Sequence, residues 1–427
     1  MRNRLQTIRG HVLAPEADVA RIVDWPDALI CIDDQGRIVS IEAAPADCAV
    51  PETWPGTVVL PGFVDCHLHF PQTRILGSAS GPLLPWLERT VFPEEARFAD
   101  AGYAGDVAQE FCAAMLAQGT VAAGVFASAH PEATQRLFEA LAVQGLRAVA
   151  GITLMDRSAP PAARLDADAA LAALADLHAR WHGHDRGRLQ VAVVPRFAIA
   201  CSPELMRRAA ELGARHGLIV HTHISENRDE IEMTAKLFPG SADYLGVYED
   251  HGLAGPRTIL AHAVHLTHEE WARVAKGDLA VAHCPDSNFF LGSGCMPLRA
   301  ALDRGIRVGL GSDVGAGRTF SMRRVAAAAY DAALIAGGPV PPQELLWLAT
   351  RGGARVLGSG DAIGCVAPGY DADLVALDLP QTELAAADPV TAIVDALLFR
   401  HDAGPARATL VRGRPLWDSG EDRLPGR

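Results

Sequence analysis

Lysine is almost missing from this chain of 427 residues: its 38 basic residues include only Lys236 and Lys276 as lysines. An uninterrupted run of about 18 apolar residues, which a membrane-spanning helix needs, is also missing. The first 41 residues contain no apolar stretch of the kind found in secretory signals, because charged residues interrupt them. We therefore expect no membrane partner.

A surplus of positive charge is absent as well. The chain has 38 Lys and Arg against 51 Asp and Glu, a formal net charge of -13, which argues against a nucleic-acid partner. Hydrophobic residues make up 49% of the chain and charged residues 21%, as in a folded protein with a large core. Its eight cysteines are scattered without a disulfide pattern, which predicts reduced thiols and a cytoplasmic location.

The hydrophobic pattern predicts an α/β fold. Short β-rich segments occupy both ends, and between them strands alternate with Ala- and Leu-rich helices such as 106–118, 131–144, 167–181 and 203–216. Eight such units favour a closed (β/α)8 barrel over an open doubly wound sheet, since no Gly-rich loop follows the first barrel strand. The eight expected strands are 58–65, 120–126, 147–154, 189–196, 218–223, 258–262, 279–283 and 306–313.

Residues that bind metals stand at the ends of several of these strands. His67 and His69 are two residues apart in an extended segment, where every second side chain lies on the same face. Both can therefore share one cation. A barrel brings the ends of its strands to one rim, where His223 and Asp313 would join them. Catalytic zinc takes a few N/O ligands and keeps one position open. These four residues therefore predict a metal site.

Further titratable residues stand beside this predicted site. Asp313 could also accept a proton from an activated water, and Glu226, three residues beyond His223, is placed to carry a proton to substrate. Its alternative is an ordinary solvated glutamate at a helix start. His262 could bind the metal or hydrogen-bond the attacking water, and the sequence does not distinguish the two roles. His283 could reach the site or be a structural histidine, and this choice is open as well.

The motifs together resemble the guanine deaminase family of the amidohydrolase superfamily. The resemblance rests on segments spread over nearly the whole chain: residues 61–72, 83–87, 92–95, 195–197, 223–230, 261–262, 283–288 and 309–314. It implies a (β/α)8 barrel beside a small composite β-sandwich domain formed by both chain ends. The domain boundaries expected from it are 1–60 and 358–427 for the composite domain and 61–357 for the catalytic barrel.

The resemblance also assigns roles to residues. It implies one Zn²⁺ per chain, with Fe²⁺ as the alternative, and the substrate is expected to be a small-molecule purine. Because Arg196 ends the predicted fourth strand, the carboxylated lysine that bridges two metals in related barrels is missing. Asp286 departs from the family, where Asn is frequent. The implied metal ligands are His67, His69, His223 and Asp313; the catalytic residues Glu226, His262 and Asp313; and the purine contacts Gln72, Arg196, Phe197, His223 and Glu226.

The implied reaction is the hydrolytic deamination of guanine to xanthine and ammonia, a step of purine catabolism or salvage. In that reaction Glu226 would protonate a ring nitrogen. The nearest alternative is another aminohydrolase of the same superfamily that acts on a pterin, a triazine or a modified purine such as 8-oxoguanine. A more distant alternative is a non-catalytic scaffold. The family resemblance also leads us to expect a homodimer.

Overall fold

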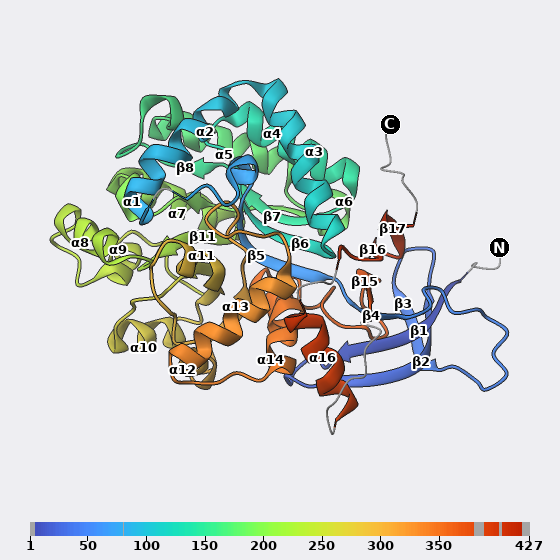
Figure 1. The fold of residues 1–427 in the computed structure, drawn as a ribbon. Helices are drawn as coiled ribbons and strands as arrows, with labels where there is room; N and C mark the ends of the chain where they lie inside the picture. The colour runs from blue at the N-terminus through green and yellow to red at the C-terminus, as the bar shows by residue number, and fades with distance from the viewer. Residues whose placement is uncertain (1–4, 80, 380–387, 401–403, 421–427) are drawn as a thin grey trace.

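The computed structural model describes residues 5–79, 81–379, 388–400 and 404–420. Its parallel strands form two four-stranded sheets and one two-stranded sheet, surrounded by helices (Figure 1). The first sheet has the order β5-β6-β7-β9 and the second β11-β12-β13-β14, while β8 pairs with β10. The strands are β5 (Phe63–His69), β6 (Thr120–Phe126), β7 (Arg147–Gly151), β8 (Thr153–Leu154), β9 (Leu189–Val191), β10 (Val194–Pro195), β11 (Val220–Ile224), β12 (Thr258–His262), β13 (Ala280–His283) and β14 (Arg307–Leu310).

Backbone contacts link these separate parallel sheets. A parallel bridge pairs Val193 with Val220, next to β9 and β11. At the other side, the N–H of Asp313 donates to the carbonyl of His67, and the N–H of His69 donates to that of Val314, both at 2.8 Å. The segment after β14 is thereby hydrogen-bonded to β5. The α/β class is confirmed, whereas the closing of these separate sheets into a (β/α)8 barrel stays a prediction.

The expected first barrel strand, 58–65, is wrong in its bounds. Two strands occupy this region: β4 (Thr57–Pro61) joins another sheet, and β5 begins at Phe63 and continues to His69. A Cβ at Gly62, between them, would lie 2.3 Å from the side chain of Val121, so only glycine permits this close approach. The two histidines therefore lie within the strand rather than after it.

Strands from both chain ends lie in one seven-stranded sheet, at one end of the molecule (Figure 1). Its order is β17-β16-β15-β4-β1-β2-β3, with β4 paired antiparallel to β15. The remaining strands are β1 (Gln6–Pro15), β2 (Ile22–Ile32), β3 (Ile38–Ala43), β15 (Leu374–Asp378), β16 (Ala408–Val411) and β17 (Arg414–Asp418). The predicted joining of the two ends is thus seen as a single sheet, and its folding into a sandwich stays a prediction.

Several of the helices that surround the parallel strands begin at a side-chain cap. Ser202 caps the helix that starts at Pro203, and Asn227 forms a capping box with Glu230. None of the helices in the described ranges combines the length and apolarity needed to cross a membrane. The principal helices are α3 (Ala101–Ala117), α4 (Pro131–Gln144), α5 (Ala167–Trp181), α7 (Pro203–His216), α8 (Arg228–Leu237), α9 (Tyr244–Asp250), α10 (His268–Lys276), α11 (Pro285–Phe290), α12 (Leu298–Asp303), α13 (Met322–Ile335), α14 (Pro342–Trp347) and α16 (Pro389–Phe399).

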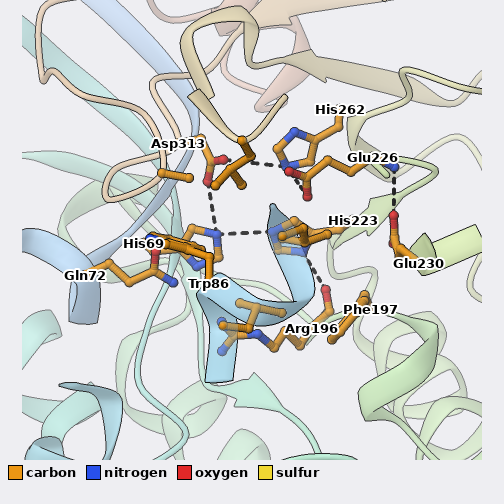
Figure 2. A pocket seen from close by; sticks show the side chains of 14 residues that line it. His69, Gln72, Trp86, Arg196, Phe197, His223, Glu226, Glu230, His262 and Asp313 are labelled. Atoms are coloured by element: carbon orange, nitrogen blue, oxygen red, sulfur yellow. Dashed lines mark hydrogen bonds and ion pairs between the residues drawn. The ribbon is translucent and has the colours of Figure 1, made fainter. Parts of the chain in front are cut away.

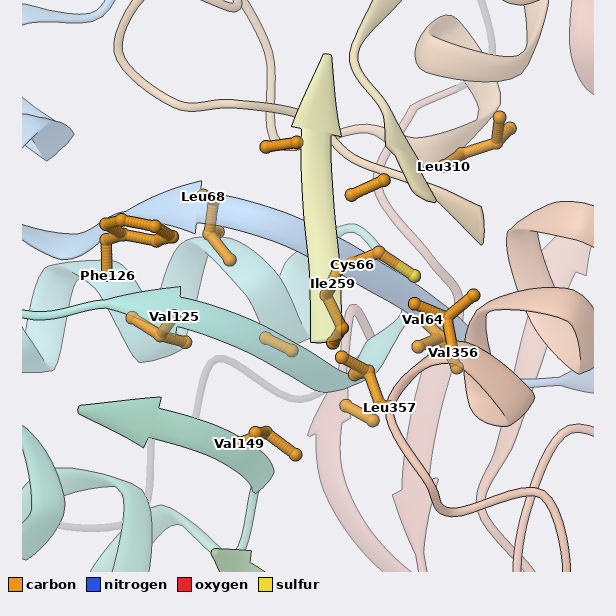
Figure 3. Packing of buried hydrophobic residues seen from close by; sticks show 14 of the residues in the cluster. Val64, Cys66, Leu68, Val125, Phe126, Val149, Ile259, Leu310, Val356 and Leu357 are labelled. Atoms are coloured by element: carbon orange, nitrogen blue, oxygen red, sulfur yellow. The ribbon is translucent and has the colours of Figure 1, made fainter. Parts of the chain in front are cut away.

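Short helices complete the architecture and carry part of the pocket. They are η1 (Phe70–Ile75), α1 (Leu83–Trp86), η2 (Leu87–Val91), α2 (Phe92–Ala96), η3 (Arg97–Ala99), η4 (Pro161–Ala163), α6 (His184–Gly187), η5 (Ala198–Ala200), η6 (Leu348–Gly352) and α15 (Gly353–Val356). Apolar side chains of β5, β6, β7 and β12 meet those of α15 in a packed core (Figure 3). A close-packed core of this kind holds the strand ends rigidly, so the side chains they carry are fixed in position.

Candidate active site

Five buried residues from four strand ends gather at one place, which we call the His/Asp cluster: His67, His69, His223, His262 and Asp313. Candidate ligand atoms of His67, His223, His262 and Asp313 all lie within 4.8 Å of one another. His69 belongs with them, because its Nε2 lies 3.2 Å from Asp313 Oδ1 and 3.1 Å from His223 Nε2. The four predicted ligands are thus together, and His262 joins them.

The Nε2 atoms of His67 and His262 show whether the His/Asp cluster suits a metal. His67 Nδ1 lies 3.0 Å from His221 Nε2, and His262 Nδ1 lies 2.9 Å from Asn288 Oδ1, so both rings are held from behind. Their Nε2 atoms are buried and make no hydrogen bond within the part of the chain that the structure describes. Both face Asp313, at 3.3 and 3.7 Å. Such unsatisfied nitrogens beside a carboxylate fit a divalent cation.

The protonation of the histidines agrees with this fit. Burial lowers the pKa of His67 to about 3 and moves that of His223 well below its ordinary value. Burial would raise the pKa of Asp313, but the contacts with His67 and His69 outweigh it and hold that pKa well below its usual range. Neutral imidazoles beside an ionised carboxylate are the protonation states that bind a metal.

Glu226 lies at the edge of the His/Asp cluster. Its Oε2 is 3.5 Å from His262 Nε2, and its side chain is buried. Burial, and then the charges of Asp313 and Glu230, raise the pKa of Glu226 well above the ordinary glutamate value. A raised pKa lets this carboxyl hold its proton to a higher pH than an ordinary glutamate, which suits a general acid. The alternative of an ordinary solvated glutamate is wrong, because the side chain is buried.

The turn that carries Glu226 is fixed by its own helix. Glu230 of α8 accepts hydrogen bonds from the backbone N–H groups of Glu226 and Asn227, at 2.8 and 3.1 Å. Positive φ angles occur at Ser225, His262 and Asp313, where strands end. Non-glycine residues rarely adopt this conformation, and such backbone strain is frequent at functional sites.

A pocket opens onto the His/Asp cluster (Figure 2). Gln72 and Arg196 form its polar wall, with Phe197 next to Arg196, and Figure 2 shows all three facing the same space as His69 and His223. The apolar remainder is lined by Leu83, Trp86, Leu87, Leu291 and Ala316. The five residues predicted to contact a purine, which are Gln72, Arg196, Phe197, His223 and Glu226, all line it.

The structure bears on His283, whose role the sequence left open, and adds two residues to the site. His283 is buried and does not line the pocket, and neither of its ring nitrogens has a partner among the described residues. Two residues were missed: Asn288, which contacts His262, and Glu95, which contacts Arg196 and Gln72. The motif 92–95 was part of the resemblance, but it gave no role for Glu95.

Comparison with known proteins gives consistent results. A model described as the amidohydrolase family matches residues 58–414. Guanine deaminase from Escherichia coli is 36% identical over 97% of this chain and 98% of its own length. Its solved structure superposes with a TM-score of 0.91, at 34% identity, over 97% of this chain and all of that chain (100%).

Two further solved structures bear on ligands. A guanine deaminase from C. acetobutylicum with guanine bound in its active site is 28% identical, with a TM-score of 0.89, over 97% of this chain and 100% of that one. An adenosine deaminase from Xanthomonas campestris with bound zinc is 26% identical, with a TM-score of 0.82, over 96% of this chain and 92% of that one.

Proposed function

The chain belongs to the amidohydrolase family and to its guanine deaminases, and on this premise we propose that it hydrolyses guanine to xanthine and ammonia. One observation carries the proposal: a single pocket is lined by four of the five residues of the His/Asp cluster, all but His67, together with the buried acid Glu226 and a polar wall of Gln72 and Arg196. A metal group, a proton donor and donors for a ring carbonyl are what this reaction needs.

We propose His67, His69, His223 and Asp313 as the ligands of one Zn²⁺ per chain, with His262 beside them. A set of three imidazoles and one carboxylate suits zinc, and Fe²⁺ is the alternative. A bound zinc ion would supply Lewis-acid chemistry, lowering the pKa of a water molecule toward neutrality. Three of these four residues line the pocket, so a bound ion would have a side open to water or substrate, as a catalytic site requires.

Different residues of the site carry out the separate proton transfers of the reaction. Asp313 accepts the proton that the attacking water releases, and His262, 3.7 Å from the Asp313 carboxylate, orients that water. Glu226 donates its proton to a ring nitrogen next to the amino-bearing carbon. Water adds its hydroxyl to that carbon, and Asp313 passes the proton that it accepted to the amino group. The carbon–nitrogen bond to that group then breaks as the added hydroxyl becomes a carbonyl and returns its proton to Glu226, and ammonia leaves with xanthine as the other product.

Arg196 and Gln72 would bind the edge of the base that bears the ring carbonyl. Both side chains offer N–H donors, and a guanidinium holds them in a fixed plane. Phe197 would pack against the flat base. Leu83, Trp86 and Leu87, which also line the pocket, would exclude water from around the base.

The larger architecture that we propose is a closed (β/α)8 barrel over residues 61–357. The bridge from Val193 to Val220 and the bonds from Asp313 and Val314 to β5 support its closure. Residues 1–60 and 358–427 would form the composite domain, which has a separate apolar cluster drawn from both ends. We also propose a homodimer in the cytoplasm, on the family resemblance and on the eight unpaired cysteines.

A substrate panel tests the proposed activity. The purified protein is assayed for ammonia release from guanine, 8-oxoguanine, adenine, cytosine, isoxanthopterin and triazines, with and without added zinc. We expect guanine to give the highest kcat/KM. Turnover of a pterin or a triazine with no turnover of guanine would overturn the proposal and favour the neighbouring aminohydrolases.

A further inference from the structure

A buried carboxylate lies behind the polar wall of the pocket. Glu95, on α2, is 5% exposed and does not line the pocket. Its Oε2 accepts a hydrogen bond from Arg196 Nη1 at 2.6 Å, and its Oε1 accepts one from Gln72 Nε2 at 3.1 Å. One carboxylate therefore holds both residues that we propose to face the purine.

The contact with Glu95 decides which way the Gln72 amide points. The backbone N–H of Gly315 donates to Gln72 Oε1 at 3.2 Å, while Nε2 donates to Glu95. A backbone N–H can only donate and a carboxylate can only accept, so the two partners together fix the oxygen and the nitrogen. The second N–H of the Gln72 amide is then the group left for a ligand.

Arg196 is constrained in the same way. It is 3% exposed, and Glu95 is its ion-pair partner. The guanidinium carbon also lies 5.4 Å from the ring centre of Phe92, which precedes Glu95 on α2. A charge-assisted hydrogen bond on one side and an aromatic ring on another define the plane of the guanidinium.

We propose that Glu95 is a positioning residue that determines specificity, because it makes the polar wall of the pocket present hydrogen-bond donors only. The inference rests on the proposed function and deepens it. A ring with acceptors at this edge, such as a carbonyl oxygen and a ring nitrogen, is bound. A ring with an amino group there places donor against donor and is rejected.

The test compares two neighbouring glutamates. Glu95→Gln keeps the shape of the side chain but offers one acceptor where the carboxylate offers two. Glu94→Gln is the matched control: Glu94 is also buried on α2, but its carboxylate binds Tyr103 and, at 2.9 Å, Arg97 outside the pocket. For each protein the assay gives kcat and KM for guanine, the inhibition constant of 2,6-diaminopurine, the zinc content and the melting temperature.

We expect Glu95→Gln to raise KM for guanine by about 10- to 100-fold, the usual effect of losing a charged hydrogen bond. Its kcat should fall less than KM rises, and its zinc content should match the wild type. Because the Gln72 amide is free to turn, binding of 2,6-diaminopurine relative to guanine should improve by about tenfold. Glu94→Gln should keep the kinetics and the substrate preference of the wild type.

A double-mutant cycle separates positioning from general loss of structure. If Glu95 acts through Gln72, the effects of Glu95→Gln and Gln72→Ala on KM are not additive. Additive effects, loss of zinc from Glu95→Gln, or kinetics equal to those of Glu94→Gln would overturn the role of Glu95. Should Glu95→Gln not fold, the cycle is measured with Glu95→Asp. A wild type that is inactive on guanine would refute the proposed function itself, which the first assay reveals.

Discussion

The ring Nδ1 of His223 lies 2.5 Å from the carbonyl oxygen of Arg196. Since a carbonyl only accepts, Nδ1 carries the proton and Nε2 is left with its lone pair toward the His/Asp cluster. The side chain of Arg196 extends the other way, into the contact with Glu95. One residue thus orients a proposed metal ligand with its backbone and the proposed substrate with its side chain.

Removing His223 tests the metal site. We expect about one zinc per chain in the wild type. His223→Ala should lose both zinc and activity, because it removes one of the four proposed ligands. Elemental analysis and ammonia release measure the two effects. His216→Ala, which changes an exposed histidine at the end of α7, is the control and should keep both. Two tightly bound metals per chain would contradict a mononuclear site.

Glu226→Gln separates proton transfer from metal binding. The amide keeps the shape of the side chain but cannot donate a carboxyl proton, so we expect zinc to be retained and kcat to fall by about 10² to 10⁴. Single-turnover assays of ammonia release, together with zinc analysis, measure this. Near-normal turnover would show that Glu226 is not the proton donor.

Asn288 allows the two proposed roles of His262 to be distinguished. Its Oδ1 lies 2.9 Å from His262 Nδ1, and partners of this kind change metal affinity or activity by about 10- to 100-fold when removed. We expect Asn288→Ala to lower kcat within that range while zinc affinity, measured by competition with a chelator, stays near the wild-type value. A loss of zinc affinity instead would identify His262 as a ligand, and no change would leave Asn288 without a role.

The parts of the site that follow from local pattern were predictable from the sequence. The spacing of His67 and His69, two residues apart on β5, predicted that both side chains lie on one face. The polar residues at the ends of later strands completed the prediction of the His/Asp cluster, because parallel strands end at a common edge. The role of Glu95 was not predictable: its partner Arg196 is 101 residues away, and only the packing of α2 brings them together. The bounds of β5 were also missed, because the requirement for Gly62 arises from contact with Val121 on the neighbouring strand.

The choice between guanine and adenine rests on Arg196. Adenine carries an amino group where guanine has its ring carbonyl, so the guanidinium N–H that faces the ring would lose its acceptor although Glu95 still binds the other side, at a cost of roughly 1 to 3 kcal/mol or more. We therefore expect guanine to be deaminated and adenine not.

Arg196→Lys tests the geometry of this contact separately from its charge. Lysine keeps the charge but has no planar fork, so it cannot bind Glu95 and the ring carbonyl with the same fixed geometry. We expect kcat/KM for guanine to fall by about tenfold or more, as loss of a charged hydrogen bond implies, with zinc content unchanged. Arg207→Lys, on the exposed face of α7, is the control and should have no effect. If Arg196→Lys left guanine kinetics intact, or if the wild type deaminated adenine as readily as guanine, Arg196 would not be the residue that recognises the carbonyl, and the substrate would have to be sought among the other ring aminohydrolases.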